Sequence, residues 1–293
     1  MKRDFMPATR QGHKSTRLRA PYFVLAHHRS GSNFLNDLLQ AHPQIECINE
    51  PFSMHTRYFR ECDLAPWTKG EFDPKLFHPG LAGHDALRGY MSDFRNYMLQ
   101  SNSQRVIGFK DTVFFEKLEW LKEFMPTLKV IFLKRNLRSI VSSLLRSNLL
   151  EFWNYADLVP PAFARMYPRY ARRPGTPDDD ATALAEIAAM SVVTRYTFAH
   201  RHLRLFEHKV IHLDELMRDP EGGLRDITAF LGVDNTSEGP LSFLKTRQSA
   251  SRGGTFSSFR TKDDVENMWE RHLKPTQLQV IEDVLRAAGI DHH

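Results

Sequence analysis

The polar segment His28-Arg29-Ser30-Gly31-Ser32 follows the apolar run Tyr22–Ala26, and a helical pattern begins at Asn33. A strand, a glycine-containing loop and a helix start in this order direct successive backbone N–H groups at one point, where the helix dipole adds positive potential. Gly31 allows close approach of the backbone, the two serines add hydroxyl donors and Arg29 adds a full charge. The segment predicts an anion-binding loop, and a plain strand-to-helix turn is the alternative. The ATP-binding pattern G-x-x-x-x-G-K-[ST] is absent here.

A second pair of residues follows another apolar run, Val130–Leu133. Arg135 comes directly after the run, and Ser143 lies eight positions further on, two turns into the next expected helix. We expect both side chains to converge on a second phosphate beside the first loop. Taken alone, a surface arginine and a helix serine would be the simpler interpretation.

Together these motifs resemble those of the sulfotransferases that use 3′-phosphoadenosine-5′-phosphosulfate (PAPS). Arg29-Ser30-Gly31-Ser32-Asn33-Phe34 is similar to their 5′-phosphosulfate loop, and Arg135 with Ser143 is similar to their 3′-phosphate motif. The stretch from Arg29 to Phe52 is closest to the carbohydrate sulfotransferase branch, in which R-S-G-S, a helix and H-P precede a short strand that ends in E-P. The similarity covers roughly residues 21–60, 105–150 and 208–290.

The resemblance implies PAPS as co-substrate, with no metal ion. It assigns PAPS binding to Arg29, Ser30, Gly31, Ser32, Asn33, Phe34, Arg135, Ser143, Arg252 and Gly253. In this assignment Phe34 stacks on the adenine, with a place in the core as its alternative. Ser251-Arg252-Gly253-Gly254 matches the family's adenosine loop only loosely. Where the cytosolic branch has K-T-H, with the histidine as base, this chain has Lys110-Asp111-Thr112.

Glu50 is the predicted general base, because it ends a short strand where the carbohydrate and heparan branches place their catalytic glutamate. Glutamate ionises near pH 4, so at neutral pH a free carboxylate can accept a proton. A loop-capping or surface-paired glutamate is the alternative, and Asp111, His28 and His55 are the reserve candidates. Arg29 and Lys110 are the predicted stabilisers of charge on the transferring group.

Apolar runs alternate with helical patterns along the chain, which indicates an α/β fold with a mainly parallel, three-layer arrangement and right-handed crossovers. Strands are expected at residues 22–26, 45–48, 106–109, 130–133 and 210–213, and helices at 33–42, 113–124, 137–149, 176–206, 220–231 and 274–288. Thr176-Pro177-Asp178-Asp179 reads as the start of the longest helix.

Two variable segments, at about residues 53–100 and 151–205, are expected to bind the acceptor. Residues 151–177 contain five prolines and are predicted to be irregular. Aromatic side chains could line an acceptor pocket or belong to the core: Phe52, Tyr58, Trp67, Phe152, Trp153 and Tyr155. Four arginines could form a lid or a solvated face: Arg165, Arg169, Arg172 and Arg173.

Composition describes an ordinary soluble globular protein. The 293 residues carry a formal net charge of +5 and are 41% hydrophobic, which excludes disorder, collagen and a disulfide scaffold. Cys47 and Cys62 are wrongly spaced for a zinc site and are expected to be reduced. No apolar signal or membrane-spanning run is visible, so a cytoplasmic location is expected. We expect a basic arm at residues 1–20 and a single domain at 21–293.

The sequence therefore predicts an enzyme that transfers a sulfuryl group from PAPS to a hydroxyl group of a small molecule, glycan or glycolipid. A small-molecule kinase on a related fold is the second hypothesis, and the Arg-to-Ser spacing counts against it. A nucleic-acid-binding module is the third, and a net charge of only +5 without a recognised reader motif counts against it.

Overall fold

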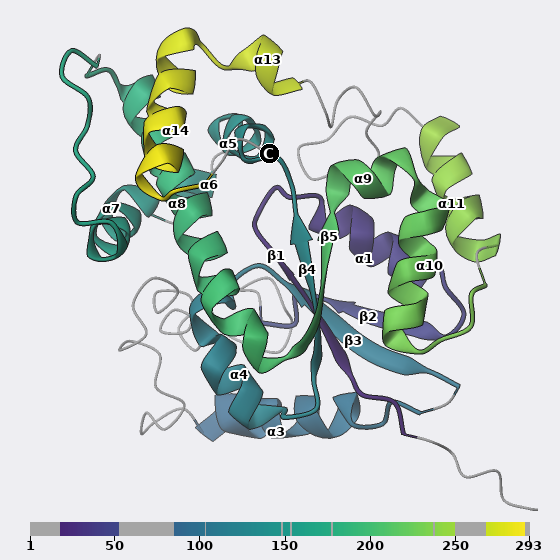
Figure 1. Cartoon of the computed structure of the whole chain (residues 1–293). Helices are drawn as coiled ribbons and strands as arrows, with labels where there is room; N and C mark the ends of the chain where they lie inside the picture. Colours follow the sequence, from purple (N-terminus) through teal and green to yellow (C-terminus); the bar gives the residue numbers. More distant parts are fainter. Residues whose placement is uncertain are drawn as a thin grey trace, which may run out of the picture.

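The computed structural model describes residues 18–52, 85–102, 104–147, 149–152, 154–176, 178–236, 238–249 and 268–290. Within these ranges five parallel strands form one sheet in the order β2-β3-β1-β4-β5 (Figure 1). Their bounds are β1 Tyr22–Ala26, β2 Ile45–Asn49, β3 Val106–Asp111, β4 Lys129–Lys134 and β5 Glu207–His212. The predicted mainly parallel α/β fold is confirmed, and all five expected strands are present.

Helices cover both faces of this sheet (Figure 1). Their bounds are α1 Ser32–Gln40, α3 Asp85–Met98, α4 Leu118–Phe124, α5 Leu137–Leu145, α6 Leu149–Phe152, α7 Tyr155–Met166, α8 Asp180–His202, α9 Leu213–Arg218, α10 Pro220–Leu231, α11 Glu238–Ser249, α13 Met268–His272 and α14 Pro275–Ala287. Short 3-10 turns at Phe115–Lys117 and Leu203–Leu205 precede α4 and follow α8.

Strand β1 lies at the centre of the molecule, and all five of its residues are fully buried. Because successive side chains of a strand point to opposite faces, Phe23 and Leu25 join one hydrophobic core, with α3, α4, α5, α7, α8 and α14. Tyr22 and Val24 join the other core, with α1, α9, α10 and α11. A strand that is buried on both faces explains why the sequence shows a continuous apolar run here instead of an alternating pattern.

The order in which strands are added to the sheet reverses at β1, because β3 pairs with one side of β1 and β4 pairs with the other. The register aligns Leu25 with Asp111 of β3 and Ala26 with Leu133 of β4. The segments that follow β1, β3 and β4 therefore leave the sheet at the same edge. In open α/β sheets such a switch point is where ligands bind.

The prediction of an irregular segment at residues 151–177 is wrong for most of its length. Helix α7 includes both Pro160 and Pro161, and it buries Tyr155, Val159 and Phe163. Packing of this apolar face against α8 outweighs the two missing backbone donors. Part of the segment at 53–100 is also regular, because α3 occupies residues 85–98.

The longest helix starts later than predicted. Asp179, in an extended conformation, is the N-cap of α8 and accepts a hydrogen bond of 2.9 Å from the backbone N–H of Thr182. The Thr182 hydroxyl donates to the other Asp179 oxygen, so this carboxylate provides the cap that the sequence assigned to Thr176.

Gly108 of β3 provides a direct test of this packing. A Cβ added there would lie 2.2 Å from the Tyr22 ring, so Gly108→Ala forces the neighbouring strands or the ring to move. We expect a loss of about 1–3 kcal/mol in the free energy of unfolding, measured by urea denaturation. The control is Gly89→Ala in α3, where the new Cβ meets nothing within 4 Å and should add about 0.5–1 kcal/mol. Equal stabilities of the two variants would contradict the described packing.

Candidate active site at the carboxyl edge of the sheet

The loop between β1 and α1 takes a conformation that few sequences allow. Arg29 has a φ of 66° and Gly31 a φ of 87°, both in the left-handed region. The Ser30 N–H and hydroxyl donate to the His27 carbonyl at 3.1 and 2.7 Å, which closes the turn. Any Cβ on Gly31 would also come within 2.6 Å of Leu213. Glycine is therefore required at this position by both backbone conformation and space.

The two motifs that the sequence singled out lie together. The Arg29 Nε donates to the Ser143 hydroxyl at 2.9 Å, and the Arg135 Nη1 donates to the Arg29 carbonyl at 2.9 Å. Arg135 follows β4, and Ser143 is buried in α5. The loop after the central strand is thus joined to the end of β4 and to α5 by direct contacts, as the two-phosphate hypothesis requires.

Lys110 connects the loop to β2 and β3. This lysine is fully buried, and its ammonium contacts the Asn33 side-chain oxygen at 2.7 Å and the Glu50 carboxylate at 2.6 Å. The Glu50 backbone N–H donates to the Lys110 carbonyl at 2.7 Å, and Glu50 has a φ of 45°. The Glu50 side chain is 31% exposed. The Glu50 carboxylate therefore contacts the buried Lys110 ammonium and is itself partly exposed to solvent.

Asp111 follows Lys110 and is only 1% exposed. One carboxylate oxygen accepts from the Thr112 N–H at 2.7 Å, and the other faces the Phe52 N–H at 3.4 Å. Burial, followed by the charge of Glu50, raises the pKa of Asp111 to about 7. A hydroxyl acceptor in solution reaches Glu50 more easily than Asp111, so the exposure of the two carboxylates favours Glu50 among the proposed bases.

A buried arginine supports the loop from the other side, and the sequence analysis missed it. Arg195 of α8 is fully buried; its Nη1 donates to His27 Nε2 at 2.8 Å and its Nη2 to the Tyr155 hydroxyl at 2.7 Å. Arginine cannot accept, so His27 Nε2 is the acceptor and Nδ1 carries the proton. That proton is donated to the His28 carbonyl at 2.7 Å. Burial, followed by the charge of Arg195, lowers the pKa of His27 well below its usual value.

The only available sequence signal for Arg195 is a charged residue within an apolar stretch of α8, which contains the buried residues Ala188, Ala189, Val192 and Val193. A fully buried arginine requires nearby polar partners. Those partners, His27 and Tyr155, are 168 and 40 positions away in the chain. No local pattern could therefore have identified them.

The remaining expected residues have varied positions. Phe34 is 3% exposed, and its ring packs against Phe243 with 6.4 Å between centroids, as in its core alternative. Phe52 and Tyr155 are buried core residues and not pocket walls.

Arg172 pairs with Asp178 and Glu186, and Arg173 with Asp283, as in a solvated face. Outside the described residues lie Arg252, Gly253, His55, Tyr58, Trp67, Trp153 and Cys62, and the side chain of Phe152 is also outside them.

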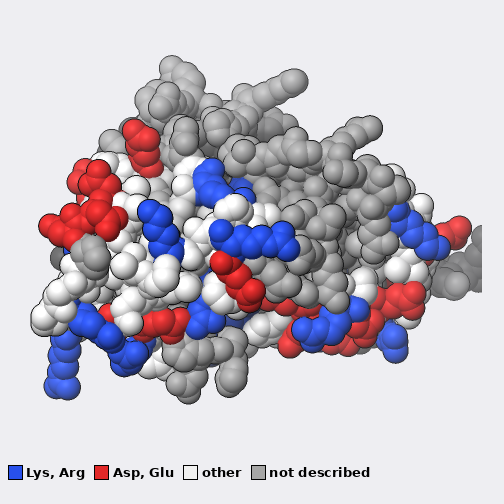
Figure 2. All heavy atoms as spheres, turned by 90° about the horizontal axis from the view of Figure 1, so that it is seen from above, with Lys and Arg blue, Asp and Glu red and all other residues white. Residues whose placement is uncertain are grey.

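Three observations concern a metal site, a membrane-spanning helix and a nucleic-acid-binding surface. Within the described ranges, no group of three or more His, Cys, Asp or Glu side chains could hold a metal ion. No described helix is long and apolar enough to cross a membrane. On the face shown in Figure 2, basic and acidic side chains are interspersed among the described residues. Such a mixture offers no support for the nucleic-acid-binding hypothesis, which needs a basic stripe.

Comparison with known proteins identifies the family of this chain. Residues 21–238 match the model of the sulfotransferase family, so the chain belongs to that family and its class of reaction is sulfuryl transfer. No curated protein shows a significant match. The carbohydrate branch expected from the sequence is not distinguished by the family match.

Solved structures share the fold at low sequence identity. The sulfotransferase domain of the curacin biosynthetic pathway is 15% identical with a TM-score of 0.55, covering 95% of this chain and 100% of its own. The sulfotransferase domain of the Synechococcus PCC 7002 olefin synthase is 16% identical with a TM-score of 0.52, covering 92% and 95%. The mouse sulfotransferase SULT7A1, complexed with PAP, is 16% identical with a TM-score of 0.53, covering 91% and 83%.

The raised pKa of Asp111 leads to a prediction about stability. Between the pKa of an unfolded aspartate, about 4, and the folded value of about 7, the folded state holds a proton that the unfolded state has lost. The stability of the protein relative to Asp111→Asn should therefore fall as pH rises through this window, by at most about 1.4 kcal/mol per pH unit. Urea denaturation at pH 5 and 7.5 measures this difference. Asp93→Asn, at an exposed position of α3, is the control, and parallel behaviour of Asp111→Asn and Asp93→Asn would contradict the assignment.

Arg195 leads to a second prediction. Arg195→Met removes the donor to His27, so His27 should lose its single tautomer and its pKa should rise. Nitrogen-15 NMR of the histidine side chains measures both changes. Adenosine 3′,5′-bisphosphate (PAP) should bind at least about tenfold more weakly, because the loop is no longer held, and Arg195→Lys should recover part of the affinity. Arg201→Met, at an exposed position of the same helix, is the matched control. Unchanged His27 spectra in Arg195→Met would show that Arg195 does not control this histidine.

Proposed function

We propose that this protein transfers the sulfuryl group of PAPS to a hydroxyl group, with Glu50 as the general base. The observation that supports this most directly is the convergence of Arg29, Arg135 and Ser143 with the Lys110–Glu50 pair at one edge of the sheet. Arg29, Arg135 and Ser143 would bind the two phosphates. Lys110 and Glu50 would act on the sulfuryl group and the attacking hydroxyl.

The donor is proposed to lie across the loop with its two anionic ends separated. The 5′-phosphosulfate would bind the backbone N–H groups of Gly31 and Ser32, at the positive end of α1. The 3′-phosphate would bind Arg135 and Ser143. The mouse neighbour is complexed with PAP, which agrees with a donor of this type. No metal is included in the proposal, because the cationic side chains supply the positive charge.

The transfer step would be an in-line displacement at sulfur. The acceptor oxygen forms a bond to sulfur, the bond from sulfur to the 5′-phosphate oxygen breaks, and its electron pair stays on the departing phosphate. Glu50 takes the acceptor proton. Lys110 now contacts Glu50 at 2.6 Å, and it would be shared with the bridging oxygen as negative charge develops there, with Arg29 on the equatorial oxygens.

The proposed acceptor is a carbohydrate or a glycolipid. Support comes from the stretch Arg29–Phe52, whose R-S-G-S, H-P and E-P positions follow the carbohydrate branch. Along this stretch α1 links the loop to β2, and Glu50 follows β2. A screen of sulfate transfer from radiolabelled PAPS to sugars, glycolipids and phenols tests the acceptor class.

Donor binding can be tested separately by calorimetry. We expect PAP to bind tightly without magnesium, and ATP and duplex DNA to bind at least about a hundredfold more weakly. A magnesium requirement with a preference for ATP would favour the kinase hypothesis instead.

Glu50→Gln tests the base. The amide cannot accept the proton, so turnover should fall by at least about a hundredfold, while the affinity for PAP measured by calorimetry should stay within a few-fold. The loss should be smallest for acceptors with acidic hydroxyls, such as phenols, because they need less help from a base. Steady-state sulfate transfer with acceptors of different pKa measures this trend.

Glu46→Gln on β2 is the matched control, since Glu46 pairs with Arg105 at 2.7 Å and is not part of the proposed site. A loss in Glu50→Gln that is equal for all acceptors and accompanied by weak PAP binding would mean that Glu50 only positions Lys110. Near-normal turnover would exclude Glu50 as base.

A further inference from the structure

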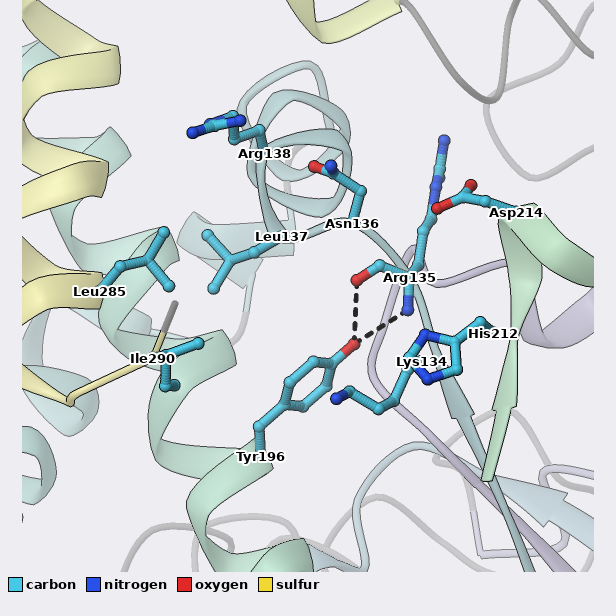
Figure 3. A pocket seen from close by; sticks show the side chains of 10 residues that line it. All are labelled: Lys134, Arg135, Asn136, Leu137, Arg138, Tyr196, His212, Asp214, Leu285 and Ile290. Atoms are coloured by element: carbon cyan, nitrogen blue, oxygen red, sulfur yellow. Dashed lines mark hydrogen bonds between the residues drawn. The ribbon is translucent and has the colours of Figure 1, made fainter. Parts of the chain in front are cut away.

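A pocket lies beyond the ends of β4 and β5, on the side of the sheet that α8 covers. It has a volume of about 120 Å³. Its lining combines basic, aromatic and aliphatic side chains: Lys134, Arg135, Asn136, Leu137, Arg138, Tyr196, His212, Asp214, Leu285 and Ile290 (Figure 3). None of the proposed transfer chemistry uses the part of this pocket around Lys134.

The basic side chains of this pocket come from adjacent positions of the sheet. Lys134 and His212 are paired in the register of β4 and β5. Figure 3 shows both side chains directed toward Tyr196, whereas the Arg135 side chain extends the other way, beside Asp214. The pocket therefore has its own pair of basic groups, separate from the arginine of the proposed 3′-phosphate site.

Among the described residues, Lys134 has no counter-charge. No described carboxylate lies within ion-pair distance of its ammonium, which instead stands 5.8 Å from the centre of the Tyr196 ring. Burial alone lowers the pKa of Lys134. Asp214, the acidic residue in the lining, lies beside Arg135, and Glu282 accepts from the lining residue Arg138 at 2.9 Å. A half-buried cation without an acidic partner favours an anion beside it.

The opposite wall is apolar. Leu137, Leu285 and Ile290 come from α5, α14 and the residues after α14, and Leu285 is buried. The Tyr196 hydroxyl is already used, because it accepts from the Arg135 N–H at 3.2 Å. A ligand would thus meet one cationic end and one aliphatic end. A cavity of roughly 150 Å³ holds a benzene-sized molecule, so this one suits a ligand of at most about six non-hydrogen atoms.

We propose that the pocket around Lys134, His212 and Ile290 binds a small carboxylate with a short alkyl chain. The carboxylate would lie between Lys134 and His212, and the alkyl chain would contact Leu137, Leu285 and Ile290. This site is additional to the proposed donor site and does not depend on it.

Butyrate is the probe, and binding is followed by ligand-observed NMR with and without saturating PAP. We expect millimolar binding that PAP does not displace and that the neutral isostere butanamide does not show. Lys134→Met should weaken it at least about tenfold. The matched control Lys245→Met, an exposed lysine of α11, should not change it.

A second variant keeps the test independent of any folding defect in Lys134→Met. Ile290→Ala shortens the apolar wall near the end of the chain, so it should weaken butyrate several-fold and leave the shorter acetate unaffected. Butyrate binding that is unchanged in both variants, or absent in the folded wild-type protein, would overturn the proposal. Displacement by PAP would equally overturn it, since butyrate would then occupy the donor site.

Discussion

Holding several positive charges around one loop is the constraint on which the rest of this structure depends. Lys110 and Arg195 are fully buried, and Arg29 and Arg135 are half-buried beside them. The pKa values of His27 and His28 are lowered well below the usual range by burial and by the charge of Arg195, and for His28 also by Lys110 and Arg29. An anion bound among these cations would relieve their mutual repulsion.

Each cation lies on a different element, so the sheet must bring these elements together at one edge. Lys110 lies one residue before the end of β3, Arg135 follows β4 and Arg195 lies within α8. Their described partners include the Arg29 carbonyl, the His27 ring and the Asn33 side-chain oxygen. Because strands and helices hold these groups rigidly, a bound anion would meet donors that are already oriented. Such preorganisation is the main source of electrostatic catalysis.

The sequence was sufficient to predict the site residues that come directly after strands. Continuous apolar runs identified all five strands, and the positions after β1 and β4 led to Arg29 and Arg135. The sequence was insufficient where distant residues decide the structure. Pro160 and Pro161 argued against a helix, yet the buried face of α7 against α8 overrides them. Arg195 could not be linked to His27 without the fold, because helix and loop are far apart in the chain.

The contrast between Glu50 and Asp111 shows how environment can separate two nearby carboxylates. Glu50 follows β2 and Asp111 is the last residue of the neighbouring strand β3, and both contact backbone or side-chain groups of the segment around Lys110. Asp111 is buried and receives backbone N–H donors, and its pKa of about 7 leaves it partly protonated at neutral pH. Glu50 is partly exposed and contacts the Lys110 ammonium. A protonated Asp111 removes a second negative charge from beside Glu50, and in the proposed mechanism this would let Lys110 contact Glu50 and an arriving sulfuryl group in turn. Pairs of titratable groups whose surroundings push their pKa values apart are the usual basis for dividing acid and base roles. The burial of Asp111 is therefore as much a part of the proposed mechanism as the exposure of Glu50.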